Sequence, residues 1–180
     1  RGLQAVSGQP TLNRDILFTA LEHYLGQSKP GSSGLIYVSP TIVGKSEGGF
    51  AGLRLDHTRA DMSRAILEGA AFELRQALDT LRRSGQPVDH LWLLGGATRS
   101  RHWPQIMADI TATPISTTEY AHWAALGAGV LAGAGAGLFA AETAHQQFKI
   151  PIRTIEPNPG QAAIYGDQYE LYQQAKTGMG

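Results

Sequence analysis

Residues 91–100 read Leu91-Trp92-Leu93-Leu94-Gly95-Gly96-Ala97-Thr98-Arg99-Ser100, the pattern of a strand that leads into a glycine turn and a helix. Its apolar start predicts a buried strand, which the two glycines end. Because glycine tolerates positive φ and has no Cβ, a ligand can approach the backbone at such a turn. The helix predicted to follow, from about Ser100 to Ile110, offers free N–H groups and a positive dipole end that suit a phosphate or a ribose edge. The pattern favours a binding turn, with a bare turn capped by Ser100 as the alternative.

Strands and helices alternate along the rest of the chain. Thr58 and Asp61 have the spacing of a capping box, so a helix is predicted from there to about Arg83, with Gly85 as its end. Further helices are predicted within residues 15–25, 120–141 and 162–175, and further strands at residues 35–38 and 115–118. Alternation of this kind favours an α/β domain.

The composition excludes several classes of protein. The chain has 180 residues, 42% of them hydrophobic, so one domain with a sizeable core is expected. Fifteen basic and fifteen acidic side chains balance, which leaves no basic surface for nucleic acid. The sequence has no cysteine, and its six histidines never lie three or four residues apart as paired metal ligands do. We therefore expect neither a nucleic-acid partner nor a metal site.

Five of the 22 glycines lie between Gly127 and Gly137, within a stretch, residues 120–141, that has no charged side chain. The stretch is about as long as a bilayer requires, but glycine and alanine contribute little to membrane insertion. The looser dinucleotide fingerprint Gly127-x-Gly129-x-x-Ala132 falls inside the predicted helix rather than at a strand-to-helix turn. We expect a buried helix whose small residues allow close packing, and no membrane association. Without cysteine or an export signal, a cytoplasmic protein is expected.

Two motifs around Lys45 lack the context that they need. Gly44-Lys45-Ser46 resembles the end of a P-loop, but Ser39 stands where the first glycine is required and no helix is predicted to begin at Lys45. Gly44-x-Ser46-x-Gly48 matches a nucleophile elbow, but several residues separate it from the strand that should precede it directly. Residues 40–49 are therefore interpreted as a loop.

Residues 34–139 resemble the C-terminal domain of the FGGY carbohydrate kinases, the family of xylulokinase, gluconokinase and glycerol kinase. The turn Leu94-Gly95-Gly96-Ala97-Thr98-Arg99-Ser100-x-x-Trp103 is similar to the adenosine-binding turn of that family. Gly52-Leu53 and Arg64-Ala65-Ile66-Leu67-Glu68-Gly69 are similar to its C-terminal signature, and Ala124-Ala125-Leu126-Gly127-Ala128 to its second connecting helix. The motifs follow one another in the order of the family.

The resemblance implies an actin-like ATPase domain related to RNase H, truncated at its N-terminal strands. Residues 1–180 would form a single C-terminal ATP-binding domain of a two-domain sugar kinase, without the N-terminal domain that binds the sugar and supplies the catalytic base. It implies that the nucleotide contacts Gly95, Gly96, Ala97 and Ser100, with Gly8 as a further contact. No catalytic residue is expected in this chain, so the fragment alone should be inactive.

The cofactors and partners follow from the same resemblance. They are ATP with Mg²⁺, a carbohydrate substrate (a sugar, polyol or sugar acid) and the N-terminal domain of the same protein. Gly44-Lys45-Ser46 stands where the family often has Gly-Glu-Arg, which leaves a non-catalytic nucleotide-sensing or interaction module on the same fold as an alternative. The sequence does not name the sugar, and it leaves the oligomeric state open, with a homodimer as one option.

Overall fold

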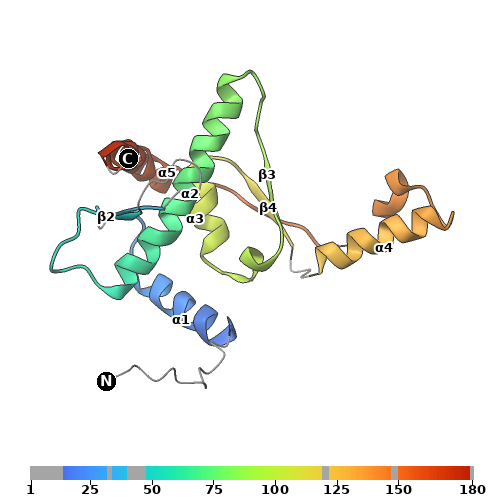
Figure 1. Cartoon of the computed structure of the whole chain (residues 1–180), viewed down its shortest axis with the longest axis horizontal. Helices are drawn as coiled ribbons and strands as arrows, with labels where there is room; N and C mark the ends of the chain where they lie inside the picture. The colour runs from blue at the N-terminus through green and yellow to red at the C-terminus, as the bar shows by residue number, and fades with distance from the viewer. Residues whose placement is uncertain (1–13, 32–33, 40–47, 119–121, 147–149, 179–180) are drawn as a thin grey trace, which may run out of the picture.

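The computed structural model describes residues 14–31, 34–39, 48–118, 122–146 and 150–178 (Figure 1). Helices and strands alternate, as the sequence predicts for an α/β domain. In chain order the elements are α1 (Arg14–Gln27), β1 (Ile36–Val38), β2 (Gly49–Ala51), α2 (Arg59–Arg83), β3 (Leu91–Leu93), the 3₁₀ helix η1 (Gly96–Arg99), α3 (Trp103–Thr111), β4 (Ile115–Thr117), α4 (Trp123–Gly135), the 3₁₀ helix η2 (Ala141–Gln146), β5 (Arg153–Ile155) and α5 (Pro159–Gly178).

Two small sheets organise these elements. One is the antiparallel pair β1–β2, and the other has the order β3-β4-β5, with β3 parallel to β4 and β5 antiparallel to it. In the second sheet Trp92 lies opposite Ser116, which lies opposite Thr154. The parallel pair is joined through α3, so the turn after β3 and the end of β4 lie at the same edge of the sheet.

The expectation that the strand before the glycine turn is buried was wrong. Leu91 and Leu93 are half-buried against Ala108 and Ile115, while Trp92 on the other face is 56% exposed. Among the described residues β3 pairs only with β4, so one of its edges is open. A strand with one covered face and one neighbour cannot bury alternate side chains on both faces.

The longest helix, α2, begins as the sequence predicts. The backbone N–H of Thr58 donates to Asp61 Oδ2 at 2.8 Å, and the N–H of Asp61 donates to Thr58 Oγ1 at 3.4 Å, which completes the capping box. The helix ends at Arg83, and Gly85 follows in the left-handed region at φ +83°. Local capping chemistry therefore sets both ends of this element.

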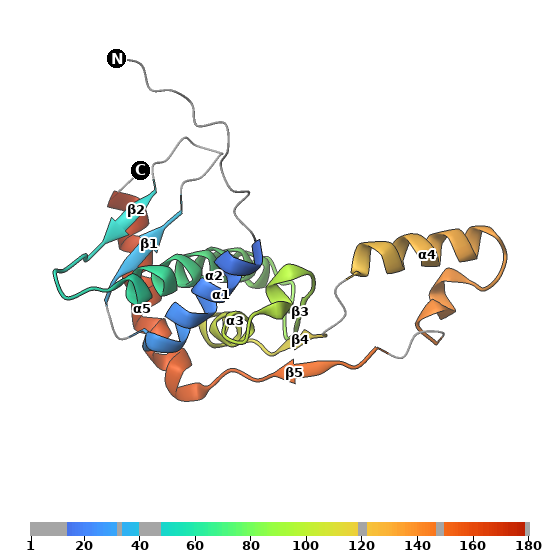
Figure 2. The same cartoon turned by 90° about the horizontal axis from the view of Figure 1, so that it is seen from below.

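The main core lies where α2, α3 and α5 meet β1. Its aromatic centre is Phe72 on α2, whose ring lies 5.2–6.2 Å from the rings of three tyrosines of α5, namely Tyr165, Tyr169 and Tyr172. At Gly69 an added Cβ would lie 2.4 Å from the carbonyl oxygen of Tyr37, so glycine is required for α2 to approach β1 this closely. These contacts form the body of the molecule seen in Figure 2.

A buried ionic network joins α2 to α5. Glu68 Oε1 accepts hydrogen bonds from Arg64 Nε at 2.7 Å and from the hydroxyl of Tyr165 at 2.6 Å, and it receives the N–H of Gly31 at 3.4 Å. The Arg64 guanidinium also donates to the Tyr165 oxygen at 2.9 Å. Burial, together with the Glu68 carboxylate, raises the pKa of Tyr165, so its hydroxyl keeps the proton that it donates.

The glycine-rich helix α4 differs from its prediction. It stands away from the body of the molecule, beside η2 (Figures 1 and 2), and Gly133 is its one buried residue among those described. An added Cβ at Gly127, Gly129 or Gly135 would meet nothing within 4 Å, so the expectation of a buried, closely packed helix was wrong. In the described part of the chain, no helix combines the length and apolar character that crossing a membrane requires.

Candidate functional site

The glycine turn after β3 is open toward solvent. Gly95 has φ +85°, a conformation that L side chains rarely adopt, and its carbonyl oxygen accepts the N–H of Thr98 at 3.1 Å and the Thr98 hydroxyl at 2.8 Å. Gly96 is exposed, and a Cβ added there would have no neighbour within 4 Å. Ala97 is half-buried beside it. The turn therefore exposes backbone that no side chain of Gly95 or Gly96 covers.

Ser100 serves as the cap of the following helix. Its hydroxyl oxygen accepts the backbone N–H groups of His102 at 3.2 Å and Trp103 at 2.9 Å, and the hydroxyl donates to Glu22 Oε1 at 2.5 Å. The helix α3 begins at Trp103, after the 3₁₀ turn, rather than at Ser100. Ser100 thus engages two N–H groups at the start of α3, those of the N-cap residue His102 and of the first helical residue Trp103, as the capping alternative expects. A contact between Ser100 and a nucleotide stays a prediction.

A carboxylate from α1 fixes this turn. Besides the hydroxyl of Ser100, Glu22 accepts the backbone N–H of Arg101 at 3.1 Å through its second oxygen. Phe18, one turn earlier on α1, lies under the guanidinium of Arg99, whose carbon is 5.2 Å from the ring centroid. The sequence contains no signal that couples α1 to a turn nearly eighty residues later.

A cleft of about 780 Å³ lies beside the turn, where the parallel strands β3 and β4 end. Its volume is in the range typical of small-molecule sites. The lining residues come from α1, from the turn, from the end of β4 and from the start of β5: Phe18, Thr98, Arg99, Ser100, Arg101, Thr117, Thr118, Pro151, Ile152 and Arg153. The structure thus places Ser100 in the wall of the cleft, whereas Gly95, Gly96 and Ala97 are not among its lining residues.

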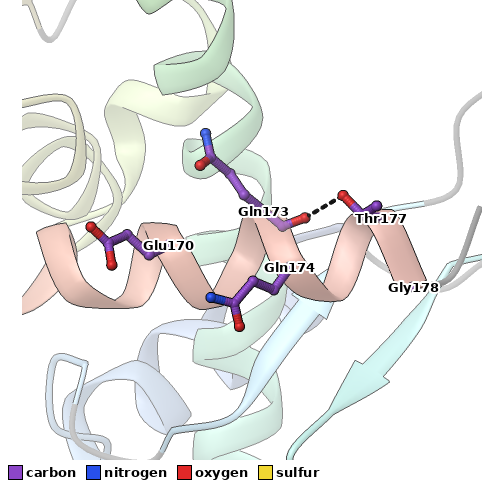
Figure 3. Close-up of a pocket in the computed structure, with 5 residues that line it drawn as sticks. All are labelled: Glu170, Gln173, Gln174, Thr177 and Gly178. Atoms are coloured by element: carbon purple, nitrogen blue, oxygen red, sulfur yellow. Dashed lines mark hydrogen bonds between the residues drawn. The ribbon is translucent and has the colours of Figure 1, made fainter.

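The remaining sequence motifs lie elsewhere. Gly8 and most of the loop 40–49 fall outside the described residues. Figure 3 shows a second hollow, which is open and lies on the surface of α5; its lining residues, Glu170, Gln173, Gln174, Thr177 and Gly178, include none of the predicted site residues. Within the described ranges, no three His, Asp or Glu side chains are grouped closely enough to hold a metal ion.

Comparison with known proteins decides the family. The family model for the C-terminal domain of the FGGY carbohydrate kinases matches residues 36–136, more than half of the chain. The chain belongs to the FGGY family of carbohydrate kinases. This span includes β3, the glycine turn, α3 and β4, whereas α1 and β5, which also contribute to the cleft, lie outside it.

Relatives of known structure and function support the assignment. Xylulose kinase from Staphylococcus epidermidis is 29% identical over 165 residues, which are 87% of this chain and 33% of that protein. The crystal structure of xylulose kinase from Rhodospirillum rubrum superposes with a TM-score of 0.77 at 26% identity and covers 91% of this chain and 34% of its own. Plasmodium falciparum glycerol kinase, solved with ADP, shares the fold with a TM-score of 0.70 at 19% identity, over 88% of this chain and 33% of its own.

These FGGY kinases have an actin-like ATPase fold, which is therefore the fold of this chain. The chain spans about a third of the length of the curated relatives that it matches. It corresponds to their C-terminal domain, as the resemblance predicts.

Proposed function

We propose that residues 1–180 form the ATP-binding C-terminal domain of an ATP-dependent carbohydrate kinase, which phosphorylates a hydroxyl of a sugar, polyol or sugar acid. The observation that carries this proposal is the open backbone of Gly95 and Gly96, at the carboxyl end of a parallel strand, in a chain of the FGGY family. Ligands of open α/β sheets bind at such strand ends. Phosphoryl transfer needs mainly positioning and electrostatic stabilisation, which a rigid turn of this kind supplies.

In this proposal the other components of the reaction come from outside the chain. We assign the base that accepts the sugar proton to the N-terminal domain, as none of the described residues that line the cleft is acidic. Mg²⁺ would arrive on the phosphates of ATP, since the described residues group no set of acidic ligands for it. Closure of the two domains over Mg·ATP would exclude water from the transfer. Because ATP is supplied inside the cell, the enzyme is placed in the cytoplasm.

The complete protein tests the proposal through two separate measurements. Titration with Mg·ADP in a calorimeter reports nucleotide binding, and coupled detection of ADP reports turnover against a panel of ketoses, polyols and aldonates. Saturable ADP binding with turnover of at least one panel member is the expected result. Binding without turnover would favour the nucleotide-sensing module, the alternative that Lys45 and Ser46 support. Absence of both would overturn the proposal.

A further inference from the structure

The cleft beside the glycine turn is rich in positive charge. Arg99 and Arg101 line it from the turn after β3, Arg153 lines it from the start of β5, and none of the described lining residues is acidic. Glu22 bonds to the same turn through the Ser100 hydroxyl and the Arg101 N–H, so its carboxylate offsets part of this charge. Several arginines in a concave site raise the local concentration of anions and match phosphate oxygens in geometry.

One of these arginines is held by its surroundings. The Arg99 guanidinium carbon lies 5.2 Å from the centroid of the Phe18 ring, a cation–π contact that restricts the side chain. Hydrogen bonds to Glu22 fix the turn to α1, so the segment that carries Arg99 and Arg101 is held in place. The guanidinium is thus oriented before a ligand arrives, which lowers the entropic cost of binding.

The second observation concerns Thr117 at the end of β4. The residue lines the cleft and is 5% exposed, and its hydroxyl oxygen is buried and has no hydrogen-bond partner in the described part of the chain. A buried hydroxyl without a partner costs about 1–3 kcal/mol, and most such groups in proteins are paired. In the sheet, Thr117 lies directly opposite Arg153, so the unpaired hydroxyl and a guanidinium come from paired positions of neighbouring strands.

We propose that this cleft binds a phosphate group, with the hydroxyl of Thr117 donating to one phosphate oxygen and Arg101 and Arg153 balancing the charge. The inference rests on the proposed function, since the phosphate then belongs to the nucleotide whose other end lies on Gly95 and Gly96. A free phosphate or a phosphorylated sugar has the same chemistry, and the experiment separates these sources. No covalent step is involved: the site orients and neutralises its ligand.

Calorimetric titration of the complete protein with ADP, adenosine, inorganic phosphate and a sugar phosphate tests the inference. Arg153→Ala and Arg101→Ala should each weaken ADP binding about tenfold, the loss of one charge-assisted hydrogen bond, and should leave adenosine binding unchanged. Arg59→Ala is the matched control, since Arg59 is exposed at the start of α2 and does not line the cleft. It should bind ADP as the wild type does.

Thr117→Val separates a ligand contact from a structural role. The hydroxyl has no partner among the described residues, so its removal should not lower the thermal midpoint of the ligand-free protein, whereas ADP binding should weaken about three- to tenfold. Thr117→Ser keeps the hydroxyl and should retain ADP affinity. A lowered midpoint with unchanged ADP affinity would overturn the assigned contact.

The outcomes for the cleft and for the proposed function are distinct. If the wild type binds ADP and both arginine variants bind it equally well, the phosphate site is overturned while the kinase proposal stands. If phosphate or a sugar phosphate binds in an arginine-dependent way and ADP does not, the phosphate site is supported and the nucleotide assignment fails. Equal loss of adenosine and ADP binding in Arg153→Ala would also overturn the phosphate site.

Discussion

A side chain at Gly96 would extend into open space, because a Cβ built there meets no atom within 4 Å. Gly96→Val should therefore leave the free energy of unfolding within about 0.5 kcal/mol of the wild type, as surface substitutions usually do. The same side chain would occupy the backbone surface predicted to receive the nucleotide. We expect ADP binding to be abolished, as measured by calorimetry on the complete protein.

Gly166 provides the control for that substitution. It lies in α5, away from the turn in sequence, and a Cβ added there also meets nothing within 4 Å. Gly166→Ala should stabilise the helix by up to about 1 kcal/mol and leave ADP binding unchanged. If Gly96→Val keeps the wild-type affinity, the nucleotide does not lie on this turn.

Two buried tyrosines of α5 give opposite predictions for the same change. Tyr165→Phe removes the hydroxyl that bonds to Arg64 and Glu68, so it should lower the free energy of unfolding by about 1–3 kcal/mol. The hydroxyl of Tyr172 is buried without a partner among the described residues, so Tyr172→Phe should be neutral or stabilising. Urea denaturation of the two variants measures both effects, and equal destabilisation would contradict the network.

At the scale of the element, the capping box of α2 makes a pH-dependent contribution. Thr58→Ala should lower the free energy of unfolding by about 1 kcal/mol at neutral pH, because the N–H of Asp61 then loses the Thr58 hydroxyl as its acceptor. Hydrogen bonds from the Thr58 side chain and backbone lower the pKa of Asp61 below its ordinary value of 3.8. The stabilisation is therefore present above pH 3.8 and is lost as the pH falls through the lowered pKa. The difference in urea midpoint between wild type and variant should become smaller as the pH falls from 7 to 2.

A second prediction concerns the apolar surface of α4 and the edge of β3 that has no partner strand among the described residues. Leu131 on α4 is 71% exposed. The N–H of Leu91 donates to the carbonyl of Pro114 on the β4 side, so the backbone N–H of the next residue, Trp92, points to the other edge of β3. A helix that is apolar all round is normally covered. We predict that the rest of the complete protein covers both. Hydrogen–deuterium exchange should be slow at α4 and at the Trp92 amide, and rapid exchange at both would contradict this contact.

The two helices show what a sequence can predict. For α2, the capping box and the three- and four-residue apolar spacing are local, so its bounds and its buried face follow from the residues themselves. For α4, the sequence predicts the helix correctly but not its exposure, because the neighbours of a helix are not encoded in its own composition. Its exposure in this chain therefore had to be observed.

The candidate site likewise has one part that the sequence predicts and one part that it does not. The glycine turn was predicted because strand, glycines and helix are contiguous in residues 91–110. The cleft was not, because Thr117 and Arg153 join Arg101 only through strand pairing, and no spacing between these segments signals it. The unpaired hydroxyl of Thr117 becomes visible only when burial and hydrogen bonds are known.

At the scale of the whole molecule, the chain supplies about a third of the length of its kinase relatives. It has the glycine turn and a cleft whose described lining includes three arginines, and we assign the sugar pocket and the catalytic base to the remainder. This division predicts that residues 1–180 alone show no kinase activity, even where they bind ADP. Turnover by this chain alone, measured as sugar-dependent ADP release, would contradict the assignment of the base.

We propose above all that the complete protein is an ATP-dependent carbohydrate kinase whose nucleotide lies on the Gly95–Gly96 turn. The most direct measurement is ADP release by the complete protein, in the presence of Mg²⁺, against a panel of ketoses, polyols and aldonates. We predict saturable, sugar-dependent release with at least one member of the panel, and its loss in Gly96→Val. No release with any member, together with no binding of ATP, would contradict the account.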